Sequence, residues 1–169
     1  INQFISFWYR FLSHSTCDPF FFRLKKAASM GSASWDALSN KNKISDLLIN
    51  SLDSQNKNIR GYLSLVLSNR NDSNAIPNII NLVHDQSSMV RACALGALGH
   101  LKAKEAKEAI YDCLGDSNLE VRKSALHAIL SLGYSLSEDK IREISKDKDY
   151  ELEKLLANLK KNGGPKGIW

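Results

Sequence analysis

Apolar residues recur at intervals of three and four along most of the chain, and short polar turns divide them into paired segments. This spacing is typical of amphipathic helices that bury one face. Apolar and polar residues do not alternate for long enough anywhere to indicate a half-buried strand. The pattern predicts four helical hairpins within residues 43–161, with approximate bounds at 43–71, 74–102, 105–134 and 138–161.

A polar motif recurs between the two helices of each hairpin. Residues 85–91 read DQSSMVR and residues 116–122 read DSNLEVR, so Asp, Val and Arg each recur 31 residues apart. An earlier copy at 53–60 reads DSQNKNIR, and a later copy at 147–153 reads DKDYELE, with Glu153 in place of Arg. Repeated hairpins that stack share one continuous core. We therefore expect an all-α fold, a short right-handed α-solenoid of about four hairpins.

Residues that start and stop helices agree with these boundaries. Pro77 suits the first turn of a helix, where an N–H group would lack a partner in any case. Ser87 and the stretch 116–118 offer N-cap oxygens before second helices. Gly99 and Gly133 lie late in, or just after, second helices, where a left-handed C-terminal residue favours glycine.

The phrases VRACALGALGHL (90–101) and VRKSALHAILSLG (121–133) each follow an Asp placed six residues before the Arg. With these features, residues 43–161 resemble HEAT repeats, and the short period resembles the branch named after phycobilisome lyases. The resemblance implies a structural ladder of hydrogen-bonded Asp and Arg side chains along the stack. A planar guanidinium can bridge a carboxylate and backbone oxygens of adjacent repeats. The expected ladder residues are Asp53, Arg60, Asp85, Arg91, Asp116, Arg122 and Asp147.

Residues 1–42 do not fit the repeat and hold nine of the fourteen aromatic residues. We expect an irregular, aromatic and basic segment, followed by the solenoid and a tail at 162–169. The segment either caps the open end of the solenoid or docks onto a partner or a membrane surface. Aromatic residues beside Arg and Lys are also typical of binding hot spots. The candidate contacts are Phe7, Trp8, Phe11, Phe20, Phe21, Phe22, Arg23, Lys25 and Lys26.

The charge is distributed unevenly along the 169 residues. Residues 1–70 hold nine Lys and Arg against four Asp and Glu, which accounts for the whole net charge of +5. This excess suits a nucleic acid, an anionic membrane face or an acidic protein, or serves only to keep the chain soluble. Since residues 71–169 are neutral, we do not expect nucleic acid as the partner.

Three cysteines form neither a C-x-x-C pair nor an even set for disulfides. This number favours a reducing soluble compartment, such as the cytosol or the plastid stroma, with peripheral membrane contact through residues 1–26 left open. Cys93 and Cys113 align with apolar or small positions of other repeats, so we expect them in the core. No apolar run approaches the roughly 18 residues of a membrane-spanning helix.

The sequence contains no phosphate-binding glycine motif, no H-E-x-x-H and no G-x-S-x-G. The four histidines are widely spaced, so we expect no metal site, no resident cofactor and no catalytic residue. A non-catalytic scaffold or adaptor, or a peripheral subunit of a larger complex, is the leading hypothesis. Its protein partner would lie on the second helices, at Arg70, His100, Lys123, His127 and Tyr134.

The resemblance also implies a second hypothesis of a different class. Phycobilin lyase subunits hold a linear tetrapyrrole and a phycobiliprotein during chromophore attachment, and such a task depends on positioning more than on a strong catalytic group. This hypothesis accommodates the missing catalytic motif, so an enzymatic role is disfavoured but stays open. Visible absorbance acquired with a tetrapyrrole would distinguish the two hypotheses.

Overall fold

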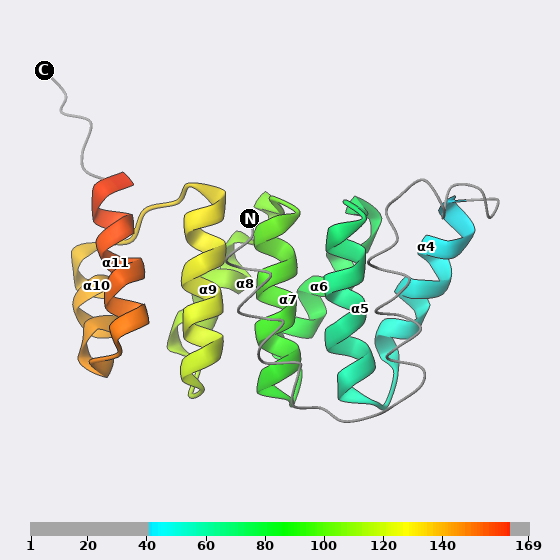
Figure 1. The fold of residues 1–169 in the computed structure, drawn as a ribbon, viewed down its shortest axis with the longest axis horizontal. Helices are drawn as coiled ribbons and strands as arrows, with labels where there is room; N and C mark the ends of the chain where they lie inside the picture. Colours follow the sequence, from blue (N-terminus) through cyan, green and yellow to red (C-terminus); the bar gives the residue numbers. More distant parts are fainter. Residues whose placement is uncertain (1–40, 163–169) are drawn as a thin grey trace, which may run out of the picture. The chain divides into compact units, whose positions relative to one another are not determined.

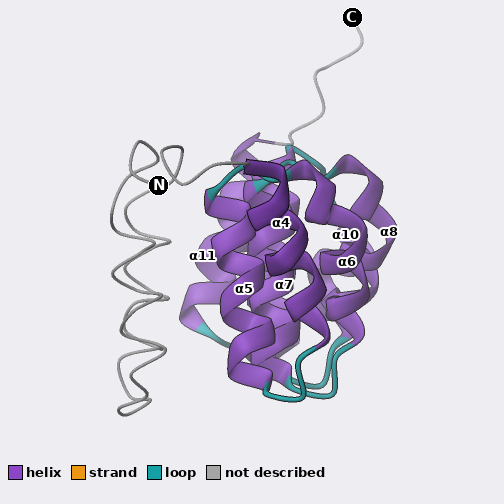
Figure 2. Cartoon of the chain, turned by 90° about the vertical axis from the view of Figure 1, so that its right-hand side faces the viewer, coloured by secondary structure: helices purple, strands orange, loops and turns teal. Residues whose placement is uncertain are grey.

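The chain divides into two units, residues 1–40 and 41–169, and the computed structural model describes residues 41–162 (Figure 1). Within that range every regular element is a helix (Figure 2). The first two hairpins comprise α4 (Lys41–Asn50), η1 (Ser51–Asp53) and α5 (Lys57–Asn69), then η2 (Ser73–Ala75), α6 (Ile76–Asn81), η3 (Leu82–His84) and α7 (Ser88–His100). The last two comprise η4 (Lys104–Ala106), α8 (Lys107–Asp112), η5 (Cys113–Gly115) and α9 (Leu119–Leu132), then α10 (Glu138–Ile144), η6 (Ser145–Asp147) and α11 (Tyr150–Asn162).

The hairpins stack in two layers. The second helices α5, α7, α9 and α11 lie side by side in one row, with α6 and α8 behind them (Figure 1). Turned by 90°, the same stack shows α6, α8 and α10 on the side opposite α5, α7 and α11 (Figure 2). In the row, α5 packs against α7 and α7 against α9. The predicted all-α class and the short α-solenoid are confirmed.

The first helices of the second and third hairpins are short because 3-10 turns flank them on both sides. Each has only six α-helical residues, although the sequence pattern predicts one continuous helix. Large apolar side chains of both layers are buried in a continuous core, and burying each of them stabilises the fold by about 1.5–3 kcal/mol. Those buried most completely include Leu52, Leu67, Ile79, Leu98, Ile110, Leu126, Ile129 and Leu152.

The ends of the second helices repeat the same geometry. Asn71, Lys102 and Gly133 all have positive φ angles (53°, 55° and 73°) and lie 31 residues apart. In each case the next residue donates its N–H back to the helix, as in Ala103 to Leu98 O at 3.1 Å. This is the Schellman arrangement, which satisfies the last carbonyl groups of a helix. Gly133 therefore has the predicted conformation.

Gly99 has a different role from the one its sequence position suggests. It lies inside α7 and not in a left-handed cap. A Cβ atom at residue 99 would lie 2.9 Å from the Cα of Ala128 and 3.2 Å from its Cβ. Glycine is needed here because α7 and α9 approach closely.

At the start of the second helices, Asn118 accepts hydrogen bonds from the N–H groups of Glu120 and Val121, as an N-cap residue should. Ser87 occupies the same position before α7, but its side chain makes no capping hydrogen bond. Instead, the Ser87 N–H donates to the Asp85 carboxylate at 2.8 Å. The turn before α7 is thus held by Asp85.

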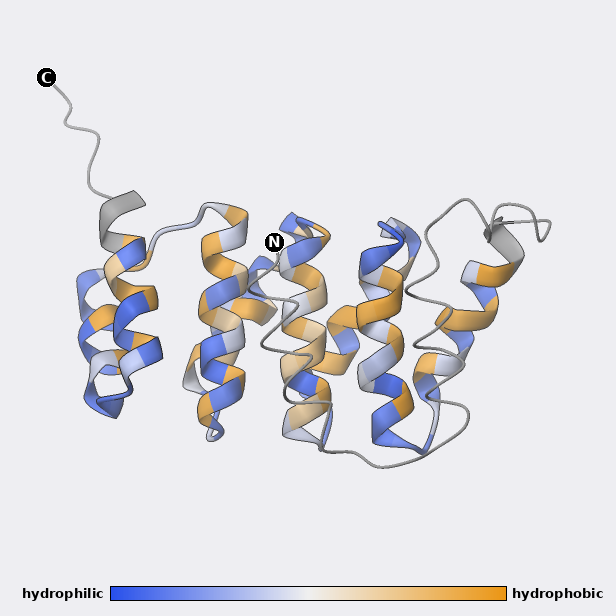
Figure 3. Cartoon of the chain, in the orientation of Figure 1, coloured by the Kyte–Doolittle hydropathy of each residue, from blue (hydrophilic) through white to orange (hydrophobic). Residues whose placement is uncertain are grey.

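Hydropathy along the stack varies in a way that bears on function (Figure 3). Most of α7 is coloured hydrophobic or neutral, whereas α10 and α11 show many hydrophilic residues. Eight consecutive residues of α7, 92–99, are buried. A helix that is buried on all sides belongs to the interior of the stack, and α7 is its central second helix.

Candidate partner-binding face

Three arginines at the starts of the second helices bridge neighbouring repeats. Arg60 on α5 donates through Nε and Nη2 to both oxygens of Asp85, at 2.6 and 2.9 Å. Arg91 on α7 binds Asp116 in the same two-point manner, at 2.7 and 2.8 Å. Arg122 on α9 contacts Asp147 at 2.9 Å. Each such pair joins one repeat to the next, and two-point geometry is the strong form of this interaction.

Each guanidinium also binds the backbone of its own repeat. The Nη1 groups of Arg60, Arg91 and Arg122 donate to the carbonyl oxygens of Ser54, Asp85 and Asp116, at 2.7, 2.9 and 2.6 Å. These carbonyls belong to the residue six positions before the arginine. The ladder therefore fixes the inter-helix turn of one repeat and its contact with the following repeat together.

The geometry corrects the predicted first member of the ladder. Ser54, not Asp53, lies six residues before its arginine, and its hydroxyl accepts the N–H of Asn56 at 3.2 Å, as Asp85 accepts that of Ser87. Asp53 is exposed at the end of η1, one residue too early. Within the described residues, no earlier repeat offers an arginine that this position would have to meet.

The ladder carboxylates are strongly held in their ionised form. Burial alone would raise the pKa of Asp85, but hydrogen bonds from Arg60 and from the Ser87 N–H outweigh it, so the pKa lies below the ordinary value. The pKa of Asp116 is lowered in the same way, by Arg91 and the Asn118 N–H acting against burial. The ladder is built for structure and leaves no proton to exchange near neutral pH.

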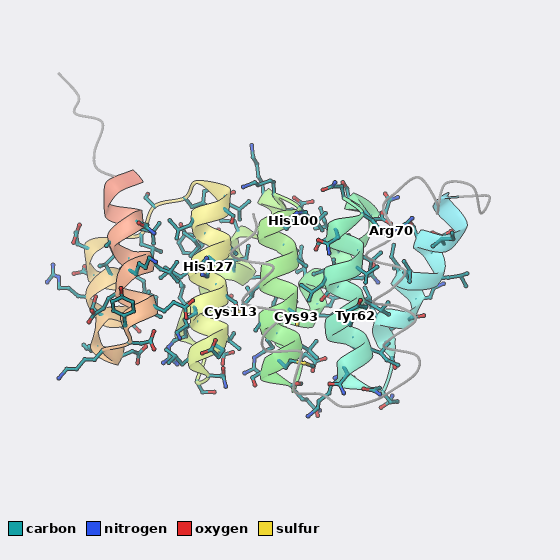
Figure 4. The ribbon with its side chains drawn as sticks, in the orientation of Figure 1. Tyr62, Arg70, Cys93, His100, Cys113 and His127 are labelled. Carbon is teal, nitrogen blue, oxygen red and sulfur yellow. The ribbon has the colours of Figure 1, made fainter. Side chains whose placement is uncertain are left out.

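The second helices expose one common face, which we call the second-helix face: the side of α5, α7, α9 and α11 seen in Figure 4. Positions 31 residues apart occupy equivalent places on it. Tyr62, Cys93 and Ser124 form one such set, and Leu65, Gly96 and His127 form another. Tyr62, Leu65 and His127 are half-buried, whereas Cys93 and Gly96 are buried. The side chains are thus small on α7 and larger on its two neighbours.

Two predicted contacts lie at the carboxyl ends of α5 and α7 (Figure 4). Arg70 is the half-buried C-cap residue of α5. His100 is exposed in the last turn of α7, and its Nδ1 lies 3.1 Å from the carbonyl oxygen of Ser68 on α5. His127 lies on α9, on the second-helix face. Burial lowers the pKa of His127, against a smaller opposing effect of Glu151. His127 is therefore neutral at pH 7.

Lys123 is not the exposed contact that its helical phase suggests. It is only 8% exposed, and its Nζ lies 3.2–3.3 Å from carboxylate oxygens of Glu120, Asp149 and Glu151. Burial alone would lower its pKa, but hydrogen bonds from Glu151 and Asp149 and the charge of Glu120 raise it overall. Lys123 holds α9 and α11 together and is not available to a partner.

Tyr134 also lies elsewhere than predicted. It follows α9 and packs on Tyr111 of α8, with 6.4 Å between the ring centroids. Tyr134 is therefore associated with the first-helix layer. The sequence analysis missed Tyr111 because its partner ring lies 23 residues away, in a loop and not in a helix.

The two described cysteines are core residues, in agreement with the sequence. Burial raises the pKa of Cys93 to about 12 and that of Cys113 to about 11. Both thiols are therefore protonated and unreactive near neutral pH. Cys93 lies at the contact between α5 and α7, because a Cβ at Gly61 would lie 3.4 Å from its Sγ.

The candidate contacts at Phe7, Trp8, Phe11, Phe20–Phe22, Arg23, Lys25 and Lys26 lie outside the described residues. In the described part of the chain, no three His, Cys, Asp or Glu side chains are grouped closely enough to hold a metal ion. None of the helices between residues 41 and 162 is both long and apolar enough to cross a bilayer.

Comparison with known proteins agrees with this geometry. A family model described as HEAT repeats matches residues 45–130, which cover α4 to α9 almost completely. A search of curated proteins found no match to the chain. Since the match spans half of the chain, and the structure shows the stacked hairpins of an α-solenoid, the chain belongs to the HEAT-repeat family.

Proposed function

We propose that the chain is a non-catalytic scaffold or adaptor that binds a protein partner on the second-helix face, as a peripheral subunit of a larger complex. HEAT repeats commonly mediate protein interactions, which supports binding of a protein in general. Repeats of this kind present extended surfaces built from equivalent helices. The finer parts of the proposal rest on the residues of that surface.

One observation carries the proposal. Beyond their ladder arginines, α5 and α7 present no charged side chain over residues 61–69 and 92–99. The half-buried side chains on this part of the second-helix face are apolar or aromatic: Tyr62, Leu65 and Met89. Depletion of charge around an aromatic residue is typical of the centre of a protein interface.

The test begins with native mass spectrometry of the protein isolated gently from its source. A particle that contains identifiable protein partners supports the proposal, and a bare particle contradicts it. Leu65→Glu and Ser131→Arg should then release the partner without lowering the melting temperature by more than a few degrees. Asp112→Lys, an exposed change on α8, serves as the matched control and should retain the partner.

The same experiment decides the tetrapyrrole alternative. A particle with an added mass of pigment size and visible absorbance would replace the scaffold proposal with tetrapyrrole handling. In that case Leu65→Glu should remove colour and not a protein partner.

We further propose that the aromatic and basic residues 1–26 add a second contact, to the partner or to an anionic membrane surface. The support is compositional: aromatic residues lie beside Arg23, Lys25 and Lys26. Deleting residues 1–26 should reduce partner binding or binding to anionic vesicles while the solenoid still melts cooperatively. Loss of cooperative melting would instead assign the segment to capping.

A further inference from the structure

Two tyrosines and one lysine form a compact group on the side of the stack away from the second-helix face. The rings of Tyr111 and Tyr134 are inclined by 44° to each other, with centroids 6.4 Å apart. The Nζ of Lys107 lies 5.8 Å from the Tyr111 centroid and 5.5 Å from that of Tyr134. A cation within about 6 Å of an aromatic ring is attracted by the negative face of that ring. Two rings therefore share one ammonium group.

The position of Tyr111 is fixed by a hydrogen bond. Its hydroxyl donates to the carbonyl oxygen of Ser135 at 2.7 Å, which ties the end of α8 to the loop after α9. The carboxylate of Glu108 acts electrostatically on Tyr111, which adds negative charge beside the ring. Both tyrosines are half-buried, whereas Lys107 is exposed at the first residue of α8. The rings are thus fixed and the lysine side chain is free to leave.

The repeat fold does not require these three residues. In the preceding repeat, 31 residues earlier, the equivalent positions hold Ile76, Ile80 and Ala103. Ile76 and Ala103 are buried, so plain hydrocarbon packing closes the same place there. Tyrosines and a cation appear only where the third repeat departs from that pattern, which indicates a role other than packing.

We propose that Tyr111 and Tyr134 form a binding site for the ammonium group of a methylated lysine on a protein partner, with Lys107 as its intramolecular occupant. The resident group is itself a lysine, so the distance between the rings suits an alkylammonium. The site offers two aromatic faces. Methylation favours such a site because it removes N–H groups that otherwise need water or an acceptor. This inference is independent of the second-helix face and stands if that face binds nothing.

The experiment uses the full chain with 13C-labelled tyrosine rings, observed by NMR. In Lys107→Ala, added Nα-acetyl-trimethyllysine amide should shift the Tyr111 and Tyr134 signals in a saturable manner. Wild-type chain should bind it about fivefold more weakly, because its own ammonium competes for about 1 kcal/mol of cation–π attraction. Unmodified Nα-acetyl-lysine amide should bind more weakly than the trimethylated probe to both chains.

Two controls keep the test specific. Tyr150 is exposed and lies outside the site, so its signal should not follow the titration. Tyr134→Leu in the Lys107→Ala chain should weaken binding about fivefold or more, since one of two aromatic walls is lost. A melting curve verifies that each variant folds.

Several results would overturn the proposal. Unmoved Tyr111 and Tyr134 signals in a folded Lys107→Ala chain would exclude the site. An equal shift of Tyr150 would show only unspecific contact. Tighter binding of choline than of trimethyllysine amide would contradict assignment to a protein partner and indicate a lipid head group as the source.

Discussion

Gly99 on α7 and Ala128 on α9 lie so close that a Cβ atom at residue 99 would be 2.9 Å from the Cα of Ala128. The neighbour at this point is backbone and cannot rotate away. The separation of the two central second helices is therefore set by the absence of a side chain at residue 99. Since α7 and α9 lie in the middle of the second-helix face, this contact also determines its shape.

We expect Gly99→Ala to destabilise the chain by about 1–3 kcal/mol, because a methyl group in a close-packed contact forces the backbone apart. Thermal unfolding followed by circular dichroism measures the change. Gly115→Ala is the matched control: a Cβ there meets nothing within 4 Å, and its φ is not positive. Equal stability of the two variants would show that the α7–α9 contact is looser than described.

Much of the fold could be predicted because the repeat is written in the sequence at a period of 31. The pairing of Arg91 with Asp116 and of Arg60 with Asp85 follows from that period, since equivalent residues of adjacent hairpins must meet. The error at Asp53 came from matching residue type over spacing. The constant distance of six residues to the arginine indicates Ser54, whose hydroxyl replaces the carboxylate.

The surface was less predictable than the stack. Helical phase places Lys123 off the core face, but its carboxylate partners Asp149 and Glu151 come from the next hairpin and enclose it. Tyr134 follows the helix, where phase no longer applies. In both cases the outcome depends on where the next loop turns, and no local pattern encodes that.

Arg91→Ala should destabilise the stack by about 1–3 kcal/mol, since Asp116, mostly buried, then loses its two-point partner. Arg91→Lys should fall between this variant and wild type, because an ammonium keeps the charge but not the paired geometry. Chemical denaturation measures both.

The control for this prediction is Arg142→Ala. Arg142 is largely exposed and contacts Asp139 at 3.5 Å, so its removal should change stability by less than about 0.5 kcal/mol. If Arg91→Ala were as mild as Arg142→Ala, the ladder would not stabilise the stack.

The ladder also predicts how stability depends on acid. The pKa values of Asp85 and Asp116 are lowered in the folded chain, so both carboxylates bind protons less readily folded than unfolded. Their contribution is fully present above the unfolded pKa of about 4 and is lost as the pH falls through the lower folded values.

We therefore expect the melting temperature of the wild-type chain to fall steeply below about pH 4. Asp116→Asn should be less stable at pH 7 and should show a shallower loss between pH 4 and pH 2, because one of these carboxylates is gone. Parallel pH profiles for the two chains would contradict the assignment of the acid sensitivity to the ladder.

Lys123→Ala should loosen the last hairpin selectively. Its removal leaves Glu120, Asp149 and Glu151 close together without the buried ammonium that neutralises one of their charges. Because these carboxylates are partly exposed, we expect a loss of about 1–2 kcal/mol, less than for a fully buried pair. Amide hydrogen exchange should accelerate in α11 and remain unchanged in α5 and α7. Lys154→Ala, an exposed change on α11, should leave exchange unchanged. Acceleration spread evenly over all four hairpins would show that the stack unfolds as one unit and that Lys123 does not act locally.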